Sequence, residues 1–279
     1  MSKSSERIYA IATIIAAAVF AVIRVVVTLL FTEKNTGVYV RDSIFPQIFQ
    51  YVLAATVIIL VILPCITKMK KQFQSRTLPR DTKATVFTAA VLGFMFLASS
   101  LLLLLTMVSQ MRFETADTIL AITGIFSSAY YLSRIFSRGC RAEATALLSM
   151  TPIVWAMTAL INVYFDMSIL ITSPNRAFSQ LALLAFSVFL LAETRMELKL
   201  ENTLLYAPAS AVSTILLAVS AIPNLLCPHI LSIGDSDRPI IYAVELAASI
   251  YSASKLYAYC AHGEKQEPKL EDQASPDKE

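Results

Sequence analysis

The sequence has little charge for its length. Only 15% of its 279 residues are Asp, Glu, Lys or Arg, whereas a soluble domain averages about 25%. The mean hydropathy is +0.64, and the apolar residues lie in blocks near or above the roughly 20 residues that cross a bilayer as a helix. The alternation typical of an outer-membrane barrel is absent. The sequence therefore excludes a soluble domain and predicts a polytopic all-α membrane bundle in contact with the lipid bilayer.

We expect about eight transmembrane helices, which form one bundle over residues 1–261. The first block follows MSKSSER, and its apolar run of about 24 residues exceeds the 7–15 of a signal peptide, so we expect an uncleaved helix. The stretch 262–279 is rich in charge and lacks aromatic residues, which predicts a disordered cytoplasmic tail. The expected spans are 8–31, 46–67, 84–108, 117–136, 144–165, 176–193, 204–226 and 239–259.

The basic residues predict the orientation of these helices. With both termini inside the cell, the inner segments hold 17 of the 23 Lys and Arg residues, as the positive-inside rule requires. This bias also explains the net charge of +3, so no nucleic-acid partner is implied. Segment 68–83 holds six of these residues, and it is a candidate contact for anionic lipid head groups besides being a topology signal.

Residue types that build many membrane sites are scarce. Of six glycines only Gly93 and Gly124 lie inside spans, which disfavours a transporter built from broken helices. The one deep proline, Pro152, is expected to kink its helix, and Thr151 beside it is placed to bond a freed backbone group. The two histidines are predicted on opposite sides of the membrane, and no pair of the four cysteines has the spacing of a metal site, so we expect no bound metal. We also identify no cofactor-binding or catalytic residue.

A charged residue stands within the first span, in the stretch Val19–Leu29, VFAVIRVVVTL. The predicted topology places Arg24 and Glu245, in the last span, at about the same depth. An unpaired charge there costs about 2.5–3.5 kcal/mol, so we hypothesise an intramembrane ion pair between the two. The alternatives are that Arg24 extends to the outer surface while Glu245 is protonated or faces water, or that either residue pairs with another group.

The last span also carries a polar helix face. Tyr242, Glu245, Ser249 and Ser252 follow the spacing i, i+3, i+7, i+10, which places them on one side. Such a face serves helix packing through interhelical hydrogen bonds, or it lines a pathway for a small polar solute or a proton. Lys255 completes an S-x-x-K match, but near the inner end its side chain is expected to extend to the interface.

Two stretches resemble a known group of proteins. Residues 151–198, TPIVWAMTALINVYFDMSILITSPNRAFSQLALLAFSVFLLAETRMEL, and the early loop FTEKNTGVYVRDSIF are similar to segments of uncharacterised multi-pass membrane proteins of Clostridia. The resemblance implies no activity, cofactor or site residue. It implies only an address in a bacterial cell (inner) membrane.

Three functions remain open for such a chain. Transport of a small solute, with or without protons, is favoured by the number of spans, the polar face and the lack of a soluble domain. A non-catalytic accessory or assembly protein requires no further sequence feature, and the sequence does not identify its protein partners. An intramembrane enzyme is disfavoured, because it needs convergent titratable groups and only Arg24 and Glu245 are evident.

Overall fold

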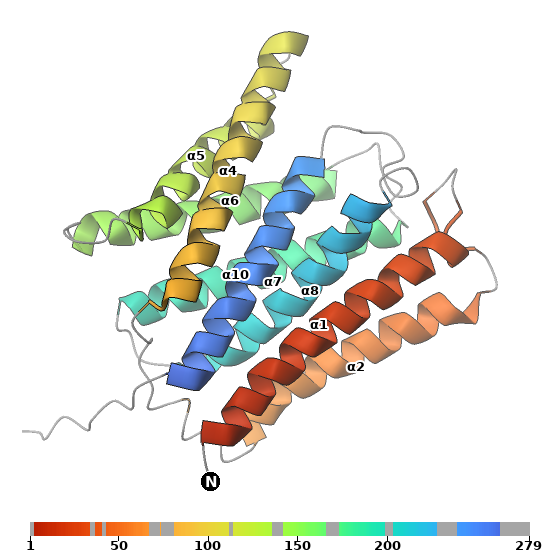
Figure 1. Cartoon of the computed structure of the whole chain (residues 1–279). Helices are drawn as coiled ribbons and strands as arrows, with labels where there is room; N and C mark the ends of the chain where they lie inside the picture. Colours follow the sequence, from red (N-terminus) through yellow and green to blue (C-terminus); the bar gives the residue numbers. More distant parts are fainter. Residues whose placement is uncertain are drawn as a thin grey trace, which may run out of the picture.

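The computed structural model describes residues 3–33, 37–40, 43–66, 73, 81–111, 114–135, 142–165, 173–198, 203–227 and 239–262. The predicted tail beyond residue 262 and most of the basic segment 68–83 lie outside these residues. Within them the chain forms a bundle of eight α-helices (Figure 1). They are α1 (Lys3–Phe31), α2 (Ile44–Ile66), α4 (Lys83–Gln110), α5 (Thr115–Ser133), α6 (Ala142–Phe165), α7 (Pro174–Glu197), α8 (Tyr206–Leu226) and α10 (Pro239–His262).

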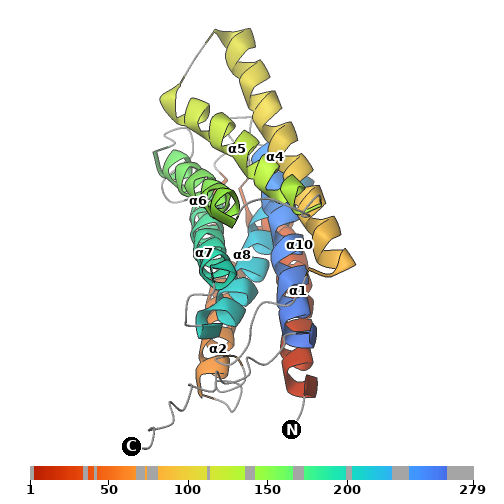
Figure 2. The same cartoon turned by 90° about the vertical axis from the view of Figure 1, so that its left-hand side faces the viewer.

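The helical bundle predicted from the sequence is confirmed. Each predicted span coincides with one helix, and most ends agree within a few residues. Six helices (α1, α2, α4, α6, α7 and α8) are long and apolar enough to cross a membrane, which makes the chain a multi-pass membrane protein. Helices α5 and α10 reach 19 and 24 residues but are more polar. That they also cross the membrane stays a prediction, which their packing among the spanning helices supports (Figure 2).

Helices α4, α5, α6, α7, α8 and α10 form a closed ring in that order, because each packs extensively on the next and α10 packs on α4 and α8. Helix α1 covers the outside of α8 and α10, and α2 lies beside α1 and α8 (Figure 1). Successive helices run in opposite directions, so the start of α1 meets the ends of α2 and α10. Tyr9 donates to the Leu60 carbonyl of α2, and the ring of Phe73 lies between Tyr9 and Tyr259 of α10. We call this end of the bundle the inner end, following the orientation predicted from the basic residues.

Helix α8 is the most enclosed helix of the bundle. In its spanning window 78% of the residues are buried, against 22% for α2 at the edge. Its alanine and serine side chains are small, which allows α1, α7 and α10 to approach closely. The interior of the ring is filled by aromatic side chains instead: Phe96 packs edge-on against Trp155 at 4.8 Å, and Tyr131 against Tyr251 at 5.2 Å.

Three prolines lie inside helices, and each removes the backbone N–H that would bond the carbonyl four residues earlier. A side-chain donor takes its place in every case. Tyr9 donates to Leu60 (3.0 Å) in α2 with Pro64, Thr151 to Leu148 (2.7 Å) in α6 with Pro152, and Arg24 to Val219 in α8 with Pro223. The expected role of Thr151 is thus observed. Helix α6 continues through Pro152, and the kink itself stays a prediction.

Candidate functional site

Arg24 lies in a polar site between α1, α7 and α8 in the outer half of the bundle. Only 1% of its surface is exposed, so it does not extend to the outer surface. Its Nη1 donates to the carbonyl of Val219, its Nη2 donates to Asn175 Oδ1 at 3.1 Å, and its guanidinium lies 4.0 Å above the ring of Phe178. Asn224 Nδ2 donates to the same Asn175 oxygen at 2.8 Å. Neutral partners therefore compensate much of the cost of burying this charge.

Glu245 on α10 belongs to the same site but makes no direct ion pair with Arg24. Its exposed fraction is also 1%, and neither carboxylate oxygen has a hydrogen-bond partner among the described residues. The two side chains are near enough for their charges to interact, and Ser220 of α8 lies beside the carboxylate. Instead of Glu245, the guanidinium bonds the proline-freed carbonyl of Val219 and the side chain of Asn175. We call Arg24, Asn175, Asn224, Ser220 and Glu245 the outer polar site.

The polar face predicted on the last helix packs against α8. Ser249 Oγ donates to the Thr214 carbonyl at 2.8 Å, and Thr214 Oγ1 lies 3.0 Å from Ser252 Oγ. Ser210 Oγ donates to the Ser252 carbonyl at 2.9 Å. Tyr242, the remaining member, is half-buried and lies close to Arg24. We call Ser210, Thr214, Ser249 and Ser252 the hydroxyl file; it begins one turn below Glu245 and ends one turn above Lys255.

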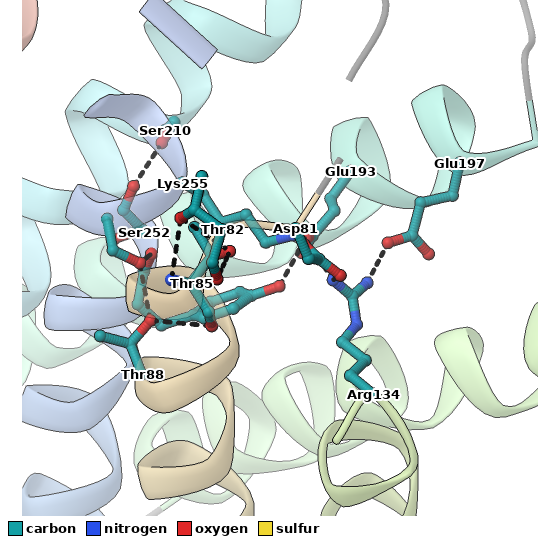
Figure 3. Close-up of polar contacts among 12 residues, drawn as sticks. Asp81, Thr82, Thr85, Thr88, Arg134, Glu193, Glu197, Ser210, Ser252 and Lys255 are labelled. Carbon is teal, nitrogen blue, oxygen red and sulfur yellow. Dashed lines mark hydrogen bonds and ion pairs between the residues drawn. The ribbon is translucent and has the colours of Figure 1, made fainter. Parts of the chain in front are cut away.

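At the inner end five charged side chains converge from four parts of the chain (Figure 3). Arg134, at the end of α5, bonds Glu197 of α7 and lies 3.5 Å from Glu193 one turn earlier. Lys255 of α10 lies 2.7 Å from Asp81, which precedes α4, and 3.5 Å from Glu193. Two cations thus meet three carboxylates. We call Asp81, Arg134, Glu193, Glu197 and Lys255 the inner charged cluster.

Neighbouring side chains hold this cluster in place. Thr82 caps α4 by accepting from the Thr85 backbone N–H at 3.2 Å, which fixes Asp81 directly before the helix (Figure 3). Tyr251 donates to Glu193 at 2.5 Å, and Tyr130 donates to Glu197 at 2.9 Å. Burial alone would raise the pKa of Asp81, but Lys255 and Arg134 together hold it below its usual value. Asp81 is therefore ionised at neutral pH.

The cluster is graded in exposure. The side chains of Asp81 and Glu197 are 37% and 26% exposed, whereas that of Glu193 is only 2% exposed. Two partly exposed carboxylates, Asp81 and Glu197, therefore lie near the buried carboxylate of Glu193. Lys255, which is 3.5 Å from Glu193, is on α10, the helix that also carries Ser249 and Ser252 of the hydroxyl file. The inner charged cluster, the hydroxyl file and the outer polar site thus follow one another along α10, from Lys255 at the inner end to Glu245 in the outer half.

The sequence did not reveal the inner charged cluster. Arg134 lies at the end of the expected span 117–136, and Asp81 and Glu197 lie just outside expected spans, where charged residues are expected to face water. Lys255 extends toward the inner end as expected and reaches the exposed carboxylate of Asp81, but its own side chain is only 7% exposed and it also lies close to the buried Glu193. One signal was present: Glu193 and Glu197 are spaced i, i+4 and share a helix face, which is costly without nearby cations.

Two further observations concern metal binding and the similarity of the chain to known proteins. Among the described residues no three His, Cys, Asp or Glu side chains are arranged to hold a metal ion. The chain matches no protein-family model, no curated protein and no solved structure. Inference about function therefore rests on the residues of the site.

Proposed function

We propose that this multi-pass membrane protein transports a small solute together with protons, and that Glu245 is the carboxyl that binds and releases the proton. The observation that carries the proposal is the polar succession along α10: the hydroxyl file lies between the level of Lys255 and that of Glu245, and we call this succession the polar route. Ten residues separate the two along α10, which corresponds to about 15 Å at 1.5 Å per residue.

The chemistry of each part suits this role. The Ser220 hydroxyl beside Glu245 can donate to a carboxylate or accept from a carboxylic acid, so the structure of the site does not commit Glu245 to one protonation state. Ionisable residues within membrane helices commonly mark proton or substrate pathways. Hydroxyl groups both donate and accept hydrogen bonds, and the contact of Thr214 with Ser252 offers one step at which a proton is passed within the file. The exposed carboxylates Asp81 and Glu197 supply a point of exchange with water.

We also place the protein in the cell (inner) membrane of a bacterium. The concentration of basic residues in alternate loops supports an inner-membrane topology with both termini in the cytoplasm. The resemblance of residues 151–198 to multi-pass proteins of Clostridia supports the same address.

The test is proton flux in proteoliposomes. The purified chain is reconstituted with a pH-sensitive dye inside the vesicles, and the membrane potential is clamped with potassium and valinomycin. Organic acids, amino acids and sugars are then added one at a time on the outside. We expect at least one class of solute to drive a proton flux that falls at least about tenfold in Glu245→Gln, the loss typical of removing a proton-transfer group.

Glu114→Gln is the matched control, because it makes the same chemical change at an exposed residue outside the route. Thr214→Val, which removes one hydroxyl of the file at nearly constant volume, should slow the flux while the protein stays folded. The proposal fails if no solute of the panel drives proton flux, or if Glu245→Gln conducts like Glu114→Gln. The polar route would then only hold the helices together, as in an accessory protein.

A further inference from the structure

The outer polar site has one donor to spare. A guanidinium carries five N–H groups in a planar fork, a shape suited to carboxylates. In Arg24 the Nη1 and Nη2 atoms are bonded to Val219 and Asn175, and the Tyr39 hydroxyl also lies beside the guanidinium, but the buried Nε has no partner among the described residues. Buried polar groups are normally satisfied, so a lone donor at a charged centre indicates a place for an acceptor that comes from outside the chain.

An apolar cavity shares the residue Phe178 with the surroundings of Arg24. It has a volume of about 430 Å³ and is formed by α2, α7 and α8, with Gln50 as its one polar side chain. Phe178 is shared by the cavity and the charged group: it lines the cavity, and the Arg24 Cζ atom lies 4.0 Å from the centroid of its ring. Ile58 and Leu181, which line the cavity, are half-exposed, so it opens at the lipid-facing side of the bundle. A charged and an apolar subsite are therefore contiguous.

The charge of the outer polar site depends on whether Glu245 carries a proton. The charged group near Glu245 is Arg24 on α1, and the titratable side chains beside Arg24 are Tyr39 and Tyr242. Burial raises the pKa of Tyr39, so this residue is uncharged at neutral pH. Helices α7 and α8 present the neutral Asn175, Asn224 and Ser220, and the one titratable residue of α4, Lys83, is at the opposite end. When Glu245 is protonated, the charge of Arg24 lacks a counter-ion.

We propose that the outer polar site and the adjacent cavity bind a small monocarboxylate that bears an apolar group, and that each anion binds together with one proton. Arg24 holds the carboxylate, the cavity holds the apolar group, and Glu245 takes up the proton that keeps the interior neutral. The inference rests on the proposed function for its role in transport, but binding itself requires no transport. It names the substrate class as apolar monocarboxylates.

The test is equilibrium binding of 3-phenylpropanoate to the full chain in lipid nanodiscs, measured by calorimetry. The neutral 3-phenylpropanamide is the ligand control. Titrations in two buffers of different ionisation enthalpy give the protons taken up, and we expect about one per bound anion. We expect the amide to bind at least about tenfold more weakly, and Arg24→Lys to lose a similar factor because an ammonium lacks the planar fork.

The cavity is tested separately from the charge. Ala54→Phe fills it, and Ala55→Phe adds the same side chain at the next residue, which does not line the cavity. Only Ala54→Phe should weaken binding of 3-phenylpropanoate. The inference is overturned if the wild type does not bind the probe, if acid and amide bind equally, or if the two variants behave alike.

Failure of this inference is distinguishable from failure of the proposed function. If 3-phenylpropanoate does not bind but another solute drives a flux that requires Glu245, the substrate class is wrong and proton-linked transport stands. If the probe binds with proton uptake but no solute is transported, the binding site stands and the proposed function fails.

Discussion

Arg24 on α1 donates a hydrogen bond to the backbone carbonyl of Val219 on α8, an acceptor that Pro223 leaves without its helical donor. Two features that are each costly in a membrane, a buried cation and a proline-broken hydrogen bond, therefore satisfy one another. The same principle applies to Tyr9 with Leu60 and to Thr151 with Leu148.

This relationship predicts non-additive mutations. Arg24→Met should lower the free energy of unfolding by about 1–3 kcal/mol, because it leaves the buried Val219 carbonyl and Asn175 without a charged donor. In a Pro223→Ala background the loss should be smaller, since Ala supplies the missing N–H. Unfolding by SDS in mixed micelles measures both values. Equal losses in the two backgrounds would show that the carbonyl does not depend on Arg24.

The same compensation of a proline-freed carbonyl by a side-chain donor occurs within a single helix, α6. Thr151→Val should cost about 1 kcal/mol of unfolding free energy, because the Leu148 carbonyl loses its hydroxyl donor. The same substitution in Pro152→Ala should cost almost nothing, since the helix then bonds that carbonyl itself. A double-mutant cycle by the same unfolding assay measures the coupling. An equal cost of Thr151→Val in both backgrounds contradicts the assignment.

The inner charged cluster predicts a large effect at Arg134. Arg134→Met leaves Glu193 and Glu197 without their nearest guanidinium, and breaking a buried pair in this way costs about 3–5 kcal/mol. Adding Glu197→Gln should recover part of that loss. Thermal unfolding in detergent measures the series, with Arg195→Met as the control, because Arg195 is an exposed arginine on α7, the helix that carries Glu193 and Glu197. A loss in the control as large as that of Arg134→Met would refute this role of Arg134.

The Lys255–Asp81 ion pair predicts an acid-dependent step. Because the pKa of Asp81 is lower in the folded protein than its ordinary value of 3.8, the carboxylate adds stability above that pH. The contribution is lost as the pH falls below 3.8 through the folded pKa. With Asp81 more than one-third exposed it amounts to less than about 1 kcal/mol. Unfolding profiles over this range should be flatter in Asp81→Asn, and identical profiles would exclude the effect.

The helices could be predicted because their signal is local. The long apolar blocks predict a span at 204–226, for example, and the structure has α8 at Tyr206–Leu226. Helix α7 was expected to end at residue 193, but it continues to Glu197 because the inner charged cluster offers partners for one more turn. Neither this cluster nor the neutral partners of Arg24 could be predicted. Asn175 and the Val219 carbonyl carry no charge signal, and the packing that joins α1 to α7 and α8 is not evident in a single sequence.

The place of α1 against α8 has a consequence for biogenesis. Val219 follows Arg24 by 195 residues, so at a synthesis rate of 5–20 residues per second Arg24 waits about 10 to 40 seconds for its acceptor. Asn175 appears only slightly earlier. During that interval a newly inserted first helix carries an unmatched guanidinium, which the insertion machinery must shelter. Nascent chains that stop before α8 lack the Val219 carbonyl, so in them Arg24 is without one of the partners it has in the complete bundle.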